Sequence, residues 1–262
     1  MAATFTNEVL DVSGCKITLK RGGQGPTLLY LHGAGGAGMV DPFLQELASN
    51  YTVLIPEHPG FGGSDEPAWL DNIHDMAYFY LDFIDKLDVR GAHVVGASLG
   101  GWLAMEIAIR DASRFCAMTL MGPSGIHVKG LKKGDLFMWS PEERIKNLFH
   151  DQTIADRLLA IKPSPEMQEV LLKNIFTTAR LGWEPRLYDP NLHKWLHRIE
   201  LPTQIIWGAH DKILPAGYAP ALAEMIAGSK FHIVPQCGHL PQVERPQEFL
   251  RLFREFAATL PR

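Results

Sequence analysis

The chain has 262 residues, and its hydrophobic fraction of 46% can fill the core of one large α/β domain or two small ones, which excludes a disordered protein. Its 25 basic and 29 acidic residues leave a formal net charge of -4 without long single-sign runs, which disfavours nucleic acid and anionic membrane as partners. The three scattered cysteines form no CxxC pair and predict reduced thiols. No leader pattern and no apolar run of roughly 18 residues is present, which predicts a cytoplasmic protein.

Short β-branched runs bounded by Gly or Pro predict strands, most of them buried, at residues 16–19, 27–31, 51–55, 92–95, 116–121, 203–207 and 230–234. Helical patterns alternate with these runs. Asp41 followed by Pro42 predicts one helix start, and apolar residues at helical spacing predict helices over 73–87 and 246–257. This alternation predicts a parallel sheet covered by helices on both faces.

The alternation is interrupted between residues 124 and 194. This stretch has no convincing buried strand, but it contains helix-like segments at residues 141–149, 153–161 and 165–179. The strand and helix pattern resumes at Leu201. We therefore predict one core domain, residues 1–123 and 195–262, with a helical cap of residues 124–194 inserted into it.

Residues 96–100, GASLG, follow a predicted strand, open a predicted helix and have the form GxSxG. A serine in such a sharp turn needs small neighbours, and the helix N-terminus directs free N–H groups at developing negative charge. A glycine-rich turn with an exposed serine would be the structural alternative. The setting between strand and helix favours Ser98 as a nucleophile.

A second glycine-rich loop, residues 32–38, also follows a strand directly. It lacks the lysine of a GxxxxGK[ST] phosphate loop, so phosphate binding is the weaker hypothesis. The alternative is that its backbone N–H groups stabilise an oxyanion, which requires small side chains for close approach. His32 is expected to hold this loop by hydrogen bonds.

A serine nucleophile needs a base and a group that orients the base. His239 lies in the loop after the last predicted strand and so reaches the carboxyl edge of the sheet, where catalytic groups collect. A packed, neutral ring is expected for His93 and His232 on strands, and a structural role for His193 and His197 on a helix face. His239 is therefore the predicted base.

Asp211 occupies the equivalent loop after residues 203–207. As an isolated residue it could simply be a turn aspartate. The chain order Ser98, Asp211, His239, each just past a strand, instead favours Asp211 as the orienting acid. His210 is expected to be a neighbour and not the base.

With these motifs in order, the sequence resembles α/β-hydrolase fold enzymes over residues 27–124 and 201–256. The motifs that carry the resemblance are the GxSxG turn, His32-Gly33, PGFGGS at residues 59–64, and Gly238-His239. The resemblance implies a mostly parallel central sheet flanked by helices, with a helical cap after the sixth strand. It also implies an oxyanion hole made by the backbone N–H groups of Leu99 and Ala34. Where many relatives carry an aspartate before the PGxGxS segment, this chain has Glu57-His58.

Serine chemistry predicts acyl transfer, because relatives that cleave haloalkanes or epoxides attack with a carboxylate. Ser98 would attack a carbonyl, His239 would take its proton, and Asp211 would orient the imidazole. Hydrolysis of carboxylic esters of small, mainly apolar substrates is our first hypothesis.

The alternative is hydrolysis of a carbon-carbon bond beside a ketone, as in the hydrolases of aromatic ring-fission (meta-cleavage) keto-acids, whose length and cap this chain resembles. Many of those enzymes have a tryptophan after the catalytic histidine and a cap arginine that holds the substrate carboxylate. Here Leu240 follows His239, while Arg180 and Arg186 are available in the cap. A third hypothesis, from another class, is a hydrolase-fold ligand receptor with slow turnover.

Eight large apolar or aromatic residues of the cap are expected to pack mainly against the core: Phe137, Met138, Trp139, Phe149, Phe176, Trp183, Tyr188 and Trp195. We predict a mainly hydrophobic pocket between cap and sheet for a small-molecule substrate. No ligand cluster or cofactor motif is evident, so metal, nucleotide and flavin are not expected. The sequence leaves the natural substrate undetermined and homodimer formation open.

Overall fold

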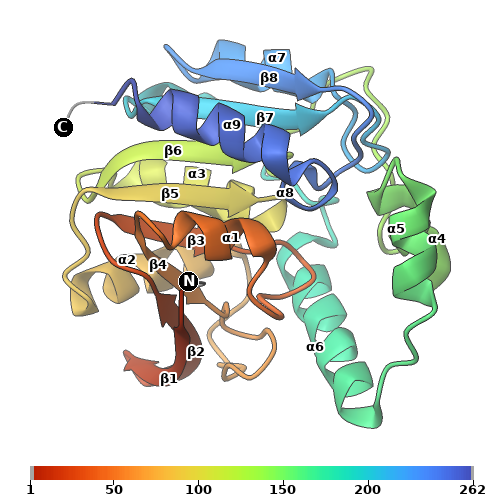
Figure 1. Ribbon diagram of the computed structural model, residues 1–262, viewed down its shortest axis with the longest axis horizontal. Coiled ribbons are helices and arrows are strands. Elements are labelled where there is room, and N and C mark those ends of the chain that lie inside the picture. The colour runs from red at the N-terminus through yellow and green to blue at the C-terminus, as the bar shows by residue number, and fades with distance from the viewer. Residues whose placement is uncertain (1–2, 261–262) are drawn as a thin grey trace.

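The structure is a computed structural model that describes residues 3–260, and one central sheet with helices on both sides dominates it (Figure 1). The strands form a single eight-stranded sheet in the spatial order β1-β2-β4-β3-β5-β6-β7-β8. Their bounds in chain order are β1 Phe5–Val12, β2 Cys15–Gly22, β3 Thr27–Leu31, β4 Thr52–Pro56, β5 Ala92–Ala97, β6 Phe115–Met121, β7 Thr203–Gly208 and β8 Lys230–Val234.

The sheet is mostly parallel, which confirms the predicted fold class. Strands β3 to β8 pair in parallel, and β2 pairs antiparallel with both β1 and β4. The sequence prediction missed β1, because only Val12 of this strand is buried and no apolar pattern marks it. The position of β1 depends on its pairing with β2, with which it forms a hairpin through Ser13 and Gly14.

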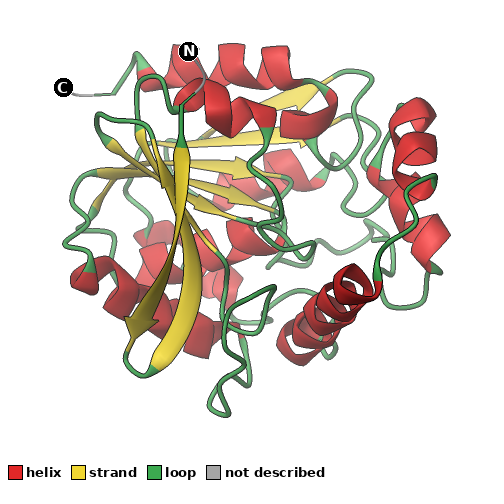
Figure 2. Cartoon of the chain, turned by 60° about the horizontal axis from the view of Figure 1, so that its bottom comes forward, coloured by secondary structure: helices red, strands yellow, loops and turns green. Residues whose placement is uncertain are grey.

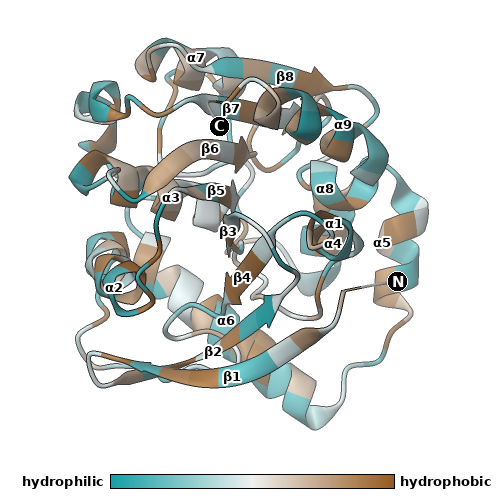
Figure 3. Ribbon diagram, turned by 60° about the vertical axis from the view of Figure 1, so that its left-hand side comes forward, coloured by the Kyte–Doolittle hydropathy of each residue, from teal (hydrophilic) through white to brown (hydrophobic). Residues whose placement is uncertain are grey.

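Helices cover the sheet in two layers (Figure 2). One face packs against α1 (Pro42–Leu47) and α9 (Pro246–Ala257), with Phe43 and Phe253 in its core. The other face packs against α2 (Ile73–Lys86), α3 (Leu99–Arg110) and α7 (Tyr218–Met225). Figure 3 shows the central strands coloured mainly as hydrophobic, while α9 alternates between hydrophobic and hydrophilic residues. Such a pattern is typical of strands buried on both faces and of an amphipathic covering helix.

The predicted start of α1 is confirmed, because this helix begins at Pro42. The side chain of Asp41, however, makes no capping hydrogen bond. The residue is partly buried, and burial of its carboxyl group raises the pKa of Asp41 to about 6. Proline at the first helical position is thus the signal that marks this start.

The helical insertion lies between β6 and β7, as expected. It contains α4 (Pro141–Leu148), α5 (Gln152–Leu159), α6 (Pro165–Gly182) and the 3-10 turns η1 (Leu192–Lys194) and η2 (Leu196–Arg198). Figure 1 shows α4, α5 and α6 on the side toward which the parallel strands point. We call residues 124–194 the cap segment; its independence as a domain remains a prediction. Within residues 3–260, the structure has no helix with the length and apolar composition that crossing a bilayer requires.

The expectation that most large apolar residues of the cap segment pack on the core is wrong for half of them. Phe149 is buried, but Met138, Phe176, Trp183 and Trp195 are each at least 49% exposed. Helical spacing shows which residues share a face, but it does not show whether another element covers that face. These four apolar side chains in and beside the cap segment are therefore left open to solvent.

The turn from β5 into α3 is packed too tightly for side chains at its glycines. A Cβ at Gly100 would lie 2.0 Å from the carbonyl oxygen of Leu31 and 2.5 Å from that of His32. A Cβ at Gly96 would lie 2.6 Å from the carbonyl oxygen of Gly100. The two glycines of the GxSxG pattern are thus needed for the close approach of α3 to β3 and β5.

Replacing Gly100 with alanine is expected to lower the free energy of unfolding by about 1–3 kcal/mol or more, because the new methyl group meets rigid backbone. Gly35→Ala is the matched control, since a Cβ there meets nothing within 4 Å. That control should change stability by less than about 0.5 kcal/mol. Urea unfolding followed by circular dichroism measures both values, and equal stability of the two variants would contradict the packing argument.

Candidate active site

Ser98 lies at the turn between β5 and α3, in a backbone conformation that is rare for a residue with a side chain. Its φ is 52° and its ψ is -112°. Its N–H donates to the carbonyl of Met121 (2.9 Å), which ties the turn to the end of β6. The side chain is partly exposed, and its hydroxyl has no hydrogen-bond partner among residues 3–260. The serine is thus held by its backbone while its hydroxyl stays available.

Asp211 and His239 form a buried pair, with 2.7 Å between Oδ2 of the acid and Nδ1 of the ring. The other carboxylate oxygen, Oδ1, accepts from the N–H groups of Ile213 (2.8 Å) and Leu214 (2.9 Å), which fix the acid in its loop after β7. Because the carboxylate accepts, Nδ1 of His239 is the donor. Nε2 then keeps its lone pair and can accept a proton.

Ser98 and His239 approach the same peptide at the end of β6. Ser98 is bonded to Met121, and a Cβ at Gly122 would lie 3.3 Å from Nδ1 of His239. No hydrogen bond joins the Ser98 hydroxyl to the His239 ring in the described part of the chain. The structure therefore joins the predicted acid to the predicted base and places the serine beside the same strand end, with its hydroxyl unbonded.

The two predicted oxyanion donors have free N–H groups. Within residues 3–260, neither the N–H of Leu99 nor that of Ala34 donates to a protein acceptor. The preceding residue of the loop lies against the serine, because a Cβ at Gly33 would be 3.3 Å from Cβ of Ser98. Leu99 is also the first residue of α3, so its N–H is one that the helix leaves unpaired.

A buried pair of histidines supports this loop. The rings of His32 and His58 stack with centroids 3.7 Å apart. Burial lowers the pKa of His32 to about 3 and holds the pKa of His58 well below its ordinary value. Two neutral rings can stack in the core without the repulsion that two imidazolium ions would have.

The hydrogen bonds around the pair identify both tautomers. The N–H of His58 donates to Nε2 of His32 (3.0 Å), so Nδ1 of His32 carries the proton and donates to the carbonyl of Gly33 (2.7 Å). Nε2 of His58 donates to the carbonyl of His32 (3.0 Å), and its Nδ1 accepts from the hydroxyl of Tyr80. The Gly33 carbonyl belongs to the same peptide as the Ala34 N–H. His32 thus orients that N–H, in agreement with its expected structural role.

Glu57, at the position where many relatives carry aspartate, contacts the same glycine-rich loop through its carboxylate. Its Oε1 accepts from the N–H of Ala37 (2.9 Å) and lies 3.5 Å from Nε2 of His32. It is 6% exposed. The Glu57 side chain therefore connects the segment before PGFGGS to the loop of residues 32–38. Among the described residues, no hydrogen bond joins it to the Asp211–His239 pair.

Three polar residues of α6, which the sequence prediction missed, connect the cap segment to the glycine-rich loops. Asn174 donates to the carbonyl of Gly35 (2.9 Å) and accepts from the N–H of Gly62 (2.9 Å). Lys173 donates to the carbonyl of Gly62 (2.9 Å), and Thr177 donates to the carbonyl of Gly60 (2.6 Å). Their spacing at i, i+1 and i+4, which places them on one side of α6, is the signal that could have revealed them.

Glu244, on α8 (Pro241–Glu244), connects the histidine loop to the cap segment. It is 6% exposed, and its two carboxylate oxygens accept from the N–H groups of Gly238 and Asp151. The N–H of His239 donates to the carbonyl of Leu148 (2.7 Å) at the end of α4. The position of His239 therefore depends on both the core and the cap segment.

A separate cluster has the residue types of a metal site: His74 on α2, Glu106 on α3 and Asp189 after α6, whose ligand atoms lie within 4.8 Å of one another. The guanidinium of Arg110 already lies there, 2.6 Å from Glu106 and 2.8 Å from Nδ1 of His74. This cation compensates the buried carboxylate. The cluster is an ion-pair network, and its residues do not point to metal chemistry.

Comparison with known proteins agrees with this architecture. Residues 28–252 match the model of the alpha/beta hydrolase family. The chain is 30% identical to the 2-hydroxy-6-oxo-6-phenylhexa-2,4-dienoate hydrolase of Comamonas testosteroni, covering 94% of this chain and 92% of the relative. It is 29% identical to the 2-hydroxymuconate semialdehyde hydrolase of Pseudomonas putida, with coverage of 94% and 92%.

The solved structures show the same fold. The meta-cleavage product hydrolase from Pseudomonas fluorescens IP01 superposes with a TM-score of 0.80 at 24% identity, covering 96% of this chain and 97% of that one. At this identity the similarity shows the shared fold alone. Together with the family match over most of the sequence, these findings show that the chain belongs to the alpha/beta hydrolase family.

Proposed function

We propose that this hydrolase cleaves a carbon-carbon bond beside a ketone in a 2-hydroxy-6-oxodienoic acid, with Ser98 as nucleophile. The observation that carries the proposal is the buried Asp211–His239 pair, 2.7 Å apart, which leaves Nε2 of the ring free beside the strained Ser98 turn. Such an arrangement suits acyl transfer through a serine. The names of the curated relatives favour a carbon-carbon bond over the ester bond of our first hypothesis.

In the proposed reaction, His239 accepts the proton of Ser98 as its oxygen attacks the ketone carbon. The free N–H groups of Ala34 and Leu99 stabilise the resulting oxyanion. The bond between the carbonyl carbon and its neighbour then breaks, and the proton passes from His239 to the departing carbon. Water, activated by His239, hydrolyses the acyl-serine to a carboxylic acid and restores the enzyme.

Ester hydrolysis is the second candidate, and two observations favour it. Leu240 follows His239, where many ring-fission hydrolases carry tryptophan. Arg180 also pairs with Glu66 (2.6 Å) on the surface, so it is not a free cation for a substrate carboxylate. The two candidates share Ser98 and its base, and they differ in the substrate that the cap segment accepts.

Measuring kcat/KM for a 2-hydroxy-6-oxodienoate and for short nitrophenyl esters distinguishes these candidates. We expect the keto-acid to be preferred by roughly 100-fold or more, because a polar group that the site binds contributes strongly to selectivity. Ser98→Ala provides the blank for both substrates and should retain the fold. A higher kcat/KM for the esters would reject carbon-carbon cleavage and leave ester hydrolysis.

Asp211→Asn should lower kcat by up to roughly four orders of magnitude, because an amide no longer holds the ring in the tautomer that leaves Nε2 free. His210→Asn is the matched control: this neighbour is exposed and stacks on His150, with ring centroids 4.1 Å apart. The control should keep kcat within a few-fold of wild type. Steady-state kinetics with circular dichroism would check both, and a nearly silent Asp211→Asn would remove this acid from the scheme.

A further inference from the structure

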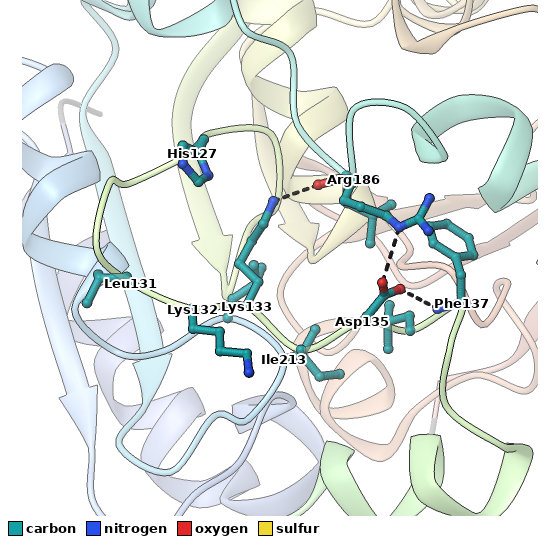
Figure 4. Close-up of a pocket in the computed structure, with 12 residues that line it drawn as sticks. His127, Leu131, Lys132, Lys133, Asp135, Phe137, Arg186 and Ile213 are labelled. Atoms are coloured by element: carbon teal, nitrogen blue, oxygen red, sulfur yellow. Dashed lines mark hydrogen bonds and ion pairs between the residues drawn. The ribbon is translucent and has the colours of Figure 1, made fainter.

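A cavity of about 250 Å³ lies at the root of the cap segment (Figure 4). One wall is the chain leaving the core, from His127 to Phe137, and another is the returning chain at residues 186–187. The third wall is formed by Ile213 and Leu214, the two residues whose N–H groups hold Asp211. A molecule in this cavity would contact the loop that positions the proposed catalytic acid.

The charges that line the cavity are unequal. Basic side chains come from His127, Lys132, Lys133 and Arg186, whereas Asp135 is the acidic residue of the lining. Asp135 is already engaged, because one of its oxygens pairs with Nε of Arg186 (3.3 Å) and the other accepts from the N–H of Phe137 (3.1 Å). Figure 4 shows these two interactions side by side. Among the described residues, neither lysine forms an ion pair with this acid.

Lys133 is a partly buried cation of the lining that has no carboxylate partner among the described residues. Its Nζ donates to the carbonyl of Arg186 (2.6 Å) and lies 4.6 Å from the ring centroid of Tyr188. No carboxylate of residues 3–260 lies within 4.0 Å of it. Burial lowers the pKa of Lys133 to about 8, although the charge of Asp135 opposes this shift. An ammonium has three donors, so up to two N–H bonds remain for a ligand.

Neither arginine of the cap segment, Arg180 or Arg186, is a free cation that could bind an anion in this cavity. Arg180 pairs with Glu66 and does not line the cavity. Arg186 lines it, but its guanidinium pairs with Asp135, donates to the carbonyl of Trp183 and lies 3.9 Å from the centroid of the Trp183 ring. A partly buried ammonium without a counter-ion is unfavourable, and a bound anion would remove that cost.

We propose that this cavity binds a carboxylate, with Lys133 as its cation. Much of the remaining wall is apolar, formed by leucine and isoleucine side chains, which suits a small acid with a hydrocarbon body better than an inorganic anion. None of Ser98, Leu99 and His239 lines this cavity. Assigning its carboxylate to the substrate therefore rests on the proposed function, whereas the proposal that the cavity binds a carboxylate does not.

Direct binding tests the site without any turnover. Sodium benzoate is titrated into the wild type by calorimetry, with neutral benzamide as its isosteric control. We expect benzoate to bind and benzamide to bind at least about tenfold more weakly. Lys133→Met should weaken benzoate by about tenfold or more, while Lys133→Arg, which keeps the charge, should stay within a few-fold of wild type. The matched control Arg180→Met should bind as wild type does.

Equal benzoate affinity of the wild type and Lys133→Met, or no binding to the wild type, would overturn the proposal. Circular dichroism establishes that the variants are folded, since Lys133 also connects the two chains at the root of the cap segment. Retained binding in Lys133→Arg separates loss of charge from loss of this connection.

Kinetics then identify the source of the carboxylate. Lys133→Met should raise KM for the keto-acid about tenfold or more and leave KM for a neutral nitrophenyl ester within a few-fold. If benzoate binding requires Lys133 but the variant keeps the wild-type KM for the keto-acid, the site binds a free acid and its assignment to the substrate is wrong. A wild type that does not cleave the keto-acid would reject the proposed function and leave the benzoate result standing.

Discussion

The positive φ of Ser98 is the constraint on which the arrangement of this protein depends. A left-handed backbone costs a residue with a side chain of order 1–3 kcal/mol, so the surrounding packing must enforce it. Here β5 ends one residue earlier, α3 begins one residue later, and Gly100 lets the helix approach the carbonyls of Leu31 and His32. The same approach brings the loop after β3 against Ser98. The positions of the proposed nucleophile and of the proposed oxyanion donors are thus consequences of one close contact.

Neutral histidines give this loop a defined orientation. In water an imidazole exchanges tautomers freely, but the buried His32 and His58 have each hydrogen bond assigned by a backbone partner or by Tyr80. The result is a fixed Gly33–Ala34 peptide next to the serine. His239 is oriented by a different means, a carboxylate on Nδ1, which leaves its other nitrogen basic. Histidine therefore has two roles here: His32 and His58 hold the loop after β3, and His239, after β8, is the proposed base.

Hydrogen bonds connect the cap segment to the loops that carry the proposed site. Asn174 and Thr177 fasten α6 to the glycine-rich loops, and Glu244 fastens the histidine loop to the start of α5. The cavity at the root of the segment lies against the residues that hold Asp211. The proposed carboxylate site and the proposed catalytic acid therefore share the backbone of Ile213 and Leu214.

Local pattern determined much of this protein. Buried runs between glycines and prolines located seven strands, and the GxSxG turn and two loops after later strands located Ser98, Asp211 and His239, because each signal lies within a few adjacent residues. Tertiary structure decided what local pattern does not contain. Strand β1 is mostly exposed, so no burial pattern marks it, although the turn at Ser13 and Gly14 that pairs it with β2 is local. The contacts of Lys133 and Asn174 are made with partners about 50 or more residues away in the sequence. Phe176 is exposed because no other segment packs over it. Contacts between distant segments arise only when the chain folds, so no window of sequence records them.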